Sequence, residues 1–155
     1  MSTYTATIRW TRTADGDFAK GQYSRAHSWE FDSGFVVPAS PSPHIVPAPW
    51  NDPNGVDPEE AFVASLSSCH MLFFVDLARR GGFVVDSYVD EAEGALEKRS
   101  DRKMAMTRVT LHPRVTWGGN PPDEATIAQL HHRAHEACFI ANSVTTEVAV
   151  EPPGA

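Results

Sequence analysis

The sequence has no cluster of basic residues. It contains 13 lysines and arginines against 20 aspartates and glutamates, which gives a formal net charge of −7. Proteins that bind nucleic acids hold the phosphate backbone with clustered Lys and Arg side chains. We therefore expect no nucleic-acid partner.

A signal peptide and a membrane span are also missing from the sequence patterns. The first residues, MSTYTATIRWTRTADGD, alternate polar and apolar side chains and lack an uninterrupted apolar core, and no later run suggests a span. We expect a cytoplasmic protein with no membrane partner. The two cysteines, Cys69 and Cys138, are then expected to be thiols rather than a structural disulfide.

The first third of the chain predicts strands followed by a long loop. Residues 4–10 place Tyr4, Ala6, Ile8 and Trp10 on one face, the alternation of a half-buried strand. A second strand is predicted over YSRAHSWEF, and a third short one over GFVVPAS, so that residues 1–37 are N-terminal strands. Residues 38–56 are rich in proline and predict a surface loop.

The rest of the chain predicts two helices and three more strands. Residues 57–80 predict one long helix, because Asp57 can be its N-cap and Glu60 the capping-box partner, and it is apolar on nearly all sides. Residues 84–117 predict a strand pair, 121–137 a helix and 144–151 a C-terminal strand. No internal repeat is present. This order predicts a single α+β domain, 1–155, with antiparallel sheets.

Two segments resemble a known family. The segment DPEEAFVASLSSC is similar to the Asn/Asp-Pro-Glu, ten-residue, Cys pattern of the OsmC/Ohr hydroperoxide-resistance proteins, and AHEACFIANSV resembles their second cysteine segment. The element order agrees with that family over nearly the whole chain. The resemblance, closest to the OsmC side, implies an intertwined homodimer in which antiparallel sheets wrap around long central helices.

The resemblance also implies a reaction. It implies a two-cysteine peroxidase that reduces alkyl or fatty-acid hydroperoxides, is reduced by an external dithiol of lipoyl type, and needs no bound cofactor or metal. By motif, Cys69 corresponds to the peroxidatic cysteine, Cys138 to the resolving cysteine, Glu59 to the motif glutamate and Arg25 to the active-site arginine. Phe139 and Ala141 stand where the family often has Pro and Ser.

The chemistry of these residue types agrees with such roles. A thiol is reactive as the thiolate, which a neighbouring cation favours, and a guanidinium can also hold a peroxide oxygen while a carboxylate orients it. Arg25 is predicted on the aromatic face of its strand, an unusual place for a cation. Ten helical residues rise about 15 Å, so Glu59 and Cys69 need a partner chain or a helix break to share a pocket.

Structural alternatives exist for each of these residues. Arg25 can be a strand-edge residue with its charge in water, Glu59 can simply favour the helix dipole, and both cysteines can be small buried hydrophobes. On the last reading, the protein is a non-enzymatic dimer that binds an apolar ligand. The aromatic residues that could line an apolar site are Trp29, Phe31, Trp50, Phe62, Phe73 and Phe74.

A metal site is the other alternative. His131, His135 and Cys138 have helical i, i+4, i+7 spacing, and His70 follows Cys69. Zinc accepts such ligands, but it would occupy the second cysteine, and histidines on a terminal helix are more often solvated.

Overall fold

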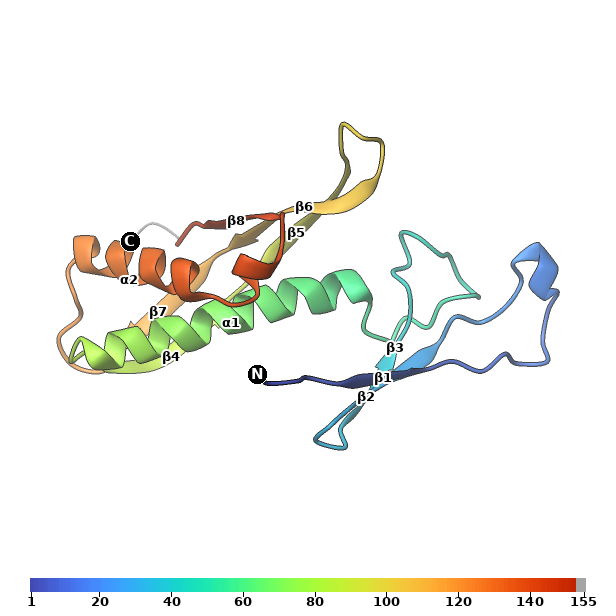
Figure 1. Cartoon of the computed structure of the whole chain (residues 1–155), viewed down its shortest axis with the longest axis horizontal. Coiled ribbons are helices and arrows are strands. Elements are labelled where there is room, and N and C mark those ends of the chain that lie inside the picture. The colour runs from blue at the N-terminus through green and yellow to red at the C-terminus, as the bar shows by residue number, and fades with distance from the viewer. Residues whose placement is uncertain (153–155) are drawn as a thin grey trace. The chain divides into compact units, whose positions relative to one another are not determined.

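The computed structural model describes residues 1–152 and divides the chain into two compact units (Figure 1). The N-terminal unit is Met1–Ala61, and the C-terminal unit begins at Phe62. The long helix α1, Pro58–Arg80, starts in the first unit and runs through the second.

The N-terminal unit contains one antiparallel sheet. Its strands are β1 (Ala6–Arg9), β2 (His27–Phe31) and β3 (Val36–Ala39), in the order β1-β2-β3. A 3-10 turn, η1 (Phe18–Lys20), lies between β1 and β2 and ends at Gly21, whose φ of 75° favours glycine. The loop after β3 returns to it, because Ala39 and Val56 form a parallel bridge.

The prediction that Arg25 lies in the second strand is wrong. β2 begins only at His27, because the Arg25 amide donates to the carbonyl of Trp50, 3.0 Å away, and not to a neighbouring strand. The Trp10 indole also donates to the Ser24 carbonyl at 3.0 Å. These bonds tie residues 24 and 25 to loop and strand-end positions instead of to the sheet.

Local sequence explains the start of α1, whose bounds lie within one residue of the predicted 57–80. The Asp57 carboxylate accepts from the Glu60 amide at 2.7 Å, and the Glu60 carboxylate accepts from the Asp57 amide at 3.2 Å. This reciprocal pair is a capping box. By length and composition, α1 could cross a membrane, which the sequence patterns did not indicate. The core helix of a soluble protein can have the same length and composition.

The strand pair predicted over 84–117 is divided into two ladders. β4 (Val85–Asp90) pairs with β7 (Pro113–Trp117), while β5 (Glu93–Lys98) pairs with β6 (Met104–Leu111). The break lies where the Asp90 carboxylate accepts from the His112 amide at 2.6 Å and also from the Ser67 hydroxyl of α1. At the junction, a backbone amide therefore donates to a side-chain carboxylate.

The last strand completes the second ladder in a direction that the alternation did not predict. β8 (Glu147–Val150) lies parallel to β6. A parallel neighbour requires a crossover, and α2 (Glu124–Ala137), capped by Asp123, followed by the 3-10 turn η2 (Ala141–Ser143), provides it. The α+β class is confirmed, with this one parallel pairing.

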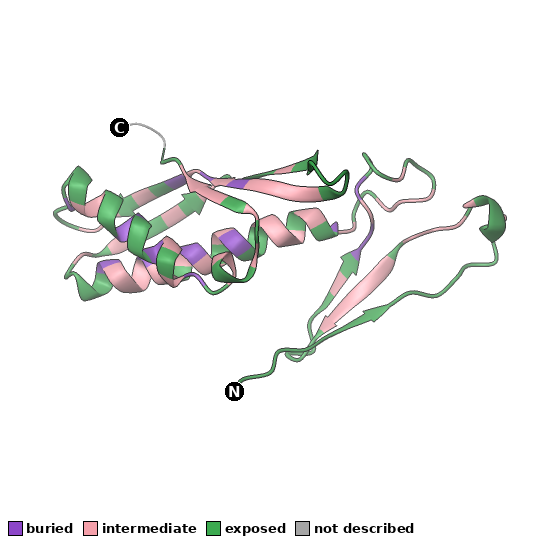
Figure 2. Ribbon diagram, turned by 45° about the horizontal axis from the view of Figure 1, so that its top comes forward, coloured by how far each residue is buried: buried purple, intermediate pink, exposed green. Residues whose placement is uncertain are grey.

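The core of the C-terminal unit has two parts. The first joins α1 to α2 through Phe74, Ala78, Leu130 and Ala134. The second packs Leu66 of α1 against Val109 and Leu111 of β6. Figure 2 shows buried residues on both helices and on the strands beside them. This packing fixes α2, and the residue that ends it, against the middle of α1.

Candidate functional site

The structure brings the two cysteines together. Cys69 lies in the middle of α1, and Cys138 is the C-cap residue that ends α2. Both are free thiols, and the Cys69 side chain lies close enough to Cys138 to contribute to raising the pKa of that thiol. Their exposure differs, because Cys69 is partly exposed whereas Cys138 is only 1% exposed.

The surroundings of Cys138 favour its protonated form. Burial, followed by the side chain of Cys69, raises the pKa of Cys138 to about 11. The Ala141 amide, at the start of η2, donates to the Cys138 sulfur at 3.4 Å and acts in the opposite direction. Cys138 is therefore a neutral thiol at neutral pH, with the Ala141 amide aimed at its sulfur.

An aromatic pair lies next to the thiols. Phe73, one turn after Cys69, packs edge-on against Phe139, with ring centroids 5.0 Å apart. Phe139 follows Cys138 directly and is 70% exposed. The residue that departs from the family pattern thus forms an apolar edge beside the thiol pair.

A buried histidine pair connects the same two helices. His70 Nε2 and His131 Nδ1 are 3.1 Å apart, and the His131 ring stacks on Phe74 with centroids 4.2 Å apart. Burial, followed by the nearby His131 and His135, lowers the pKa of His70 to about 4, and burial lowers the pKa of His131 to about 4. Nδ1 of His70 and Nδ1 of His135 are buried without a partner within residues 1–152.

The histidine pair is the feature that sequence reasoning missed. The expectation of solvated histidines fails for His131, which is 5% exposed. A signal was present, because His70 falls on the stripe Leu66, His70, Phe74 and Ala78, the buried side of α1. Among residues 1–152, no three or more His, Cys, Asp and Glu side chains form a group that could hold a metal ion.

The other two predicted site residues belong to the N-terminal unit. Arg25 Nη1 donates to the carbonyls of Tyr23 (2.9 Å) and Gly21 (3.2 Å), and the guanidinium lies 4.0 Å from the centroid of the Tyr23 ring. Glu59 lies in the first turn of α1. Within that unit, Arg25 is held by carbonyls and an aromatic ring. The thiols lie in the C-terminal unit.

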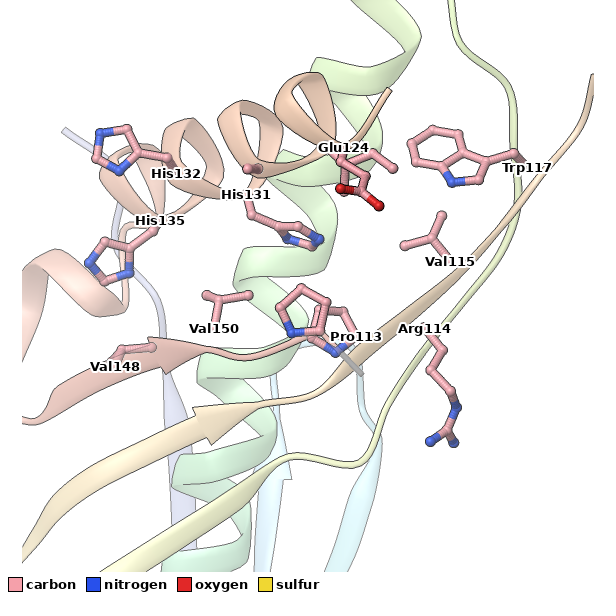
Figure 3. Close-up of a pocket in the computed structure, with 13 residues that line it drawn as sticks. Pro113, Arg114, Val115, Trp117, Glu124, His131, His132, His135, Val148 and Val150 are labelled. Atoms are coloured by element: carbon pink, nitrogen blue, oxygen red, sulfur yellow. The ribbon is translucent and has the colours of Figure 1, made fainter. Parts of the chain in front are cut away.

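A separate pocket lies in the C-terminal unit between α2, β7 and β8 (Figure 3). Its volume is about 840 Å³, and neither cysteine lines it. The α2 side presents His131, His132 and His135, as the close-up shows. The apolar walls come from these residues: Val115, Trp117, Ile127, Val148 and Val150.

The family model described as OsmC-like protein matches residues 51–152, a range that includes α1 and both cysteines. The chain belongs to the OsmC-like family. No curated protein matches it.

Solved structures extend the similarity to the whole chain. An OsmC-like protein of unknown function from Vibrio cholerae is 50% identical, with a TM-score of 0.95 and coverage of 98% of this chain and 99% of that one. An organic hydroperoxide resistance protein OsmC from Legionella pneumophila is 16% identical, with a TM-score of 0.71 and coverage of 98% and 96%. The organic hydroperoxide resistance protein of Bacillus subtilis is 20% identical, with a TM-score of 0.67 and coverage of 97% and 98%. The last two show a shared fold.

Proposed function

We propose that this OsmC-like protein is a thiol-dependent peroxidase that reduces organic hydroperoxides to alcohols. The observation that carries the proposal is the pairing of two free thiols of unequal exposure, Cys69 within reach of a substrate and Cys138 buried against it. Peroxidatic cysteines need access, and resolving cysteines need proximity. The names of the Legionella and Bacillus relatives support the reaction class at the level of the family.

The reaction has two steps within the protein. The Cys69 thiolate attacks one oxygen of the hydroperoxide, the O–O bond breaks, and the departing alkoxide takes a proton to become the alcohol. Cys69 is then a sulfenic acid. The Cys138 thiol condenses with it, water leaves, and a Cys69–Cys138 disulfide remains. An external dithiol returns both cysteines to thiols.

The first step requires a cation near Cys69, for which we propose Arg25 oriented by Glu59. α1 is unbroken from Pro58 to Arg80, so the ten residues between Glu59 and Cys69 correspond to about 15 Å of helix rise. A second chain therefore has to supply the Glu59 carboxylate, and we propose that it also supplies the Arg25 guanidinium which this carboxylate orients, so that the proposed enzyme is a homodimer. Residues of the N-terminal unit then serve the thiols of the partner.

The test is peroxide consumption by cysteine variants. With an excess of a dithiol, the wild type should consume cumene hydroperoxide faster than hydrogen peroxide, and Cys69→Ser should consume neither. Cys138→Ser should complete one turnover and stop as a Cys69 sulfenic acid, which dimedone traps. Equal consumption by the wild type and Cys69→Ser would refute the peroxidase.

The pocket favours a second candidate function, in which the family fold binds an apolar ligand and the cysteines are inert. The pocket lies apart from both thiols and has mostly apolar walls. A fluorescent fatty acid should then bind equally to the wild type and Cys69→Ser, and bind weakly to Ala128→Trp, which fills the pocket from α2. Slow alkylation of Cys69 at neutral pH together with such binding would favour this function over the peroxidase.

A further inference from the structure

We infer that reduction of the Cys69–Cys138 disulfide begins at the sulfur of Cys69 and expels Cys138. The external thiol would form its mixed disulfide with Cys69 only. This inference rests on the proposed function, because it concerns the disulfide which that function forms. The inference adds which sulfur is attacked and which one leaves. It also assigns the Ala141 amide the role of stabilising the departing Cys138.

Access to the two sulfurs is the first argument. A thiolate attacks a disulfide from the side opposite the sulfur that leaves, so the attacked sulfur needs an open path. Cys138 is 1% exposed, and its own unit causes this burial, so assembly with further chains can only reduce its exposure. Cys69 is partly exposed on α1. In the single chain, an incoming thiol therefore has a path to Cys69 and none to Cys138.

The raised pKa of the leaving sulfur, Cys138, opposes attack at Cys69, and the size of this effect can be judged. A sulfur with a raised pKa leaves more slowly, and burial, the largest cause, raises the pKa of Cys138. With a Brønsted coefficient near one half, a rise of two units slows expulsion roughly tenfold. The Ala141 amide, 3.4 Å from the Cys138 sulfur, recovers part of that loss by donating to the forming thiolate. A missing path blocks attack altogether, so access decides the order.

The raised pKa then has a second effect. After its expulsion, the Cys138 thiolate takes up a proton, because its pKa lies above neutral pH. A neutral thiol attacks a disulfide slowly, although it condenses with the more electrophilic sulfenic acid, so Cys138 does not quickly attack the mixed disulfide on Cys69 and reverse the step. The mixed disulfide on Cys69 lasts until the second thiol of the reductant attacks the reductant's own sulfur. That attack releases the Cys69 thiolate and an oxidised cyclic disulfide, which favours dithiols over monothiols.

The direct test maps the mixed disulfide. The protein is oxidised with diamide, so that the disulfide forms without peroxide, and is then exposed briefly to 2-mercaptoethanol. After an acid quench, the freed thiol is blocked with N-ethylmaleimide, and peptides are identified by mass. We expect mercaptoethanol on Cys69 and maleimide on Cys138. The reverse pattern, or equal labelling of both sites, would overturn the order.

Single-cysteine variants provide a second test, which does not require the mixed disulfide to be isolated. Cys138→Ala keeps only Cys69, and Cys69→Ser keeps only Cys138. We expect dithionitrobenzoate to react with the Cys69-only protein at least about ten times faster than with the Cys138-only protein, in which the sulfur is buried. Similar rates would overturn the inference even if one variant were less stable.

The outcomes separate this inference from the proposed function. Mercaptoethanol on Cys138 together with normal hydroperoxide consumption would reject only the order of attack. No hydroperoxide consumption together with mercaptoethanol on Cys69 would reject only the peroxidase. If diamide forms no Cys69–Cys138 disulfide, both proposals fail.

Discussion

At the scale of single residues, Arg25 shows what alternation can and cannot predict. The sequence placed it on an aromatic strand face, and the structure does place the guanidinium over Tyr23, but in the segment before β2. Its position depends on a bond to Trp50, 25 residues away, which no local pattern encodes. The two carbonyls of Gly21 and Tyr23 accept from a single nitrogen, Nη1, so the bonds of this guanidinium leave other donors for a ligand.

We expect Arg25→Ala to move the pH dependence of Cys69 alkylation to higher pH and to slow the reaction with cumene hydroperoxide. Each unit of such a shift corresponds to about 1.4 kcal/mol between thiol and thiolate. Arg25→Lys should rescue the rate only in part, because an ammonium keeps the charge but loses the planar fork. The measurement is the alkylation rate from pH 5 to pH 10. Lys20→Ala, which removes an exposed partner of Asp17 in the same unit, is the matched control and should behave as wild type.

If Arg25→Ala leaves both rates unchanged, its assignment is wrong. Arg9 and Arg12 are then the next candidates.

At the scale of elements, the sequence predicted what local chemistry determines. The capping box predicted the start of α1, and helical spacing predicted a helix over 121–137, which begins at Glu124 after the Asp123 cap. The division of the strand pair at Asp90 and the parallel β8 could not be predicted, because they depend on partners 22 or more residues away. The same applies to the thiol pair, whose approach depends on how α2 packs on α1.

The His70–His131 link between α1 and α2 should make stability depend on pH. Unfolded histidines bind protons near pH 6.5, whereas the pKa of each folded one is about 4. Between these values the unfolded chain binds more protons, so the free energy of unfolding falls as pH falls from about 6.5 to about 4. A lowering of the pKa from 6.5 to about 4 corresponds to a loss of about 3 kcal/mol for each histidine. Asp90 favours protonation of His131, and His135 opposes that of His70.

Urea unfolding at pH 7 and pH 5, at one protein concentration, measures this effect. His131→Phe keeps the stacking on Phe74 but removes one titrating group, and it should reduce the difference between the two pH values. His132→Gln is the matched control, because His132 is exposed on the same helix, and it should keep the full difference. A wild-type protein equally stable at both pH values would contradict the lowered pKa values.

At the scale of the whole molecule, α1 is the element that a single chain leaves incomplete. Only 22% of its most apolar stretch is buried, and Leu72, on the side away from the buried stripe, is 63% exposed. An apolar helix surface of this kind is stable in water only when another surface covers it. We expect a second copy of α1 to cover this apolar surface, since closed symmetry is common in soluble oligomers.

We expect light scattering of a dilute solution to show a homodimer, and Leu72→Arg to weaken it by burying an unpaired charge. Gln129→Arg, an exposed position on α2, is the control and should remain dimeric. A folded, stable wild-type monomer would contradict both the packing argument and the route by which Arg25 reaches Cys69.

The dimer also predicts complementation between two inactive variants. If Arg25 of one chain serves Cys69 of the other, a dimer of Arg25→Ala with Cys69→Ser contains one complete site, made from the intact arginine and the intact cysteine. Random pairing of equal amounts gives about half mixed dimers with one active site of two, so co-expression should restore roughly a quarter of the wild-type rate. The measurement is hydroperoxide consumption by the total purified protein from the co-expression, without selection for mixed dimers, against each variant alone. If the mixed dimer is no faster than the sum of its parents, the arginine acts within its own chain, and the argument from the unbroken α1 fails.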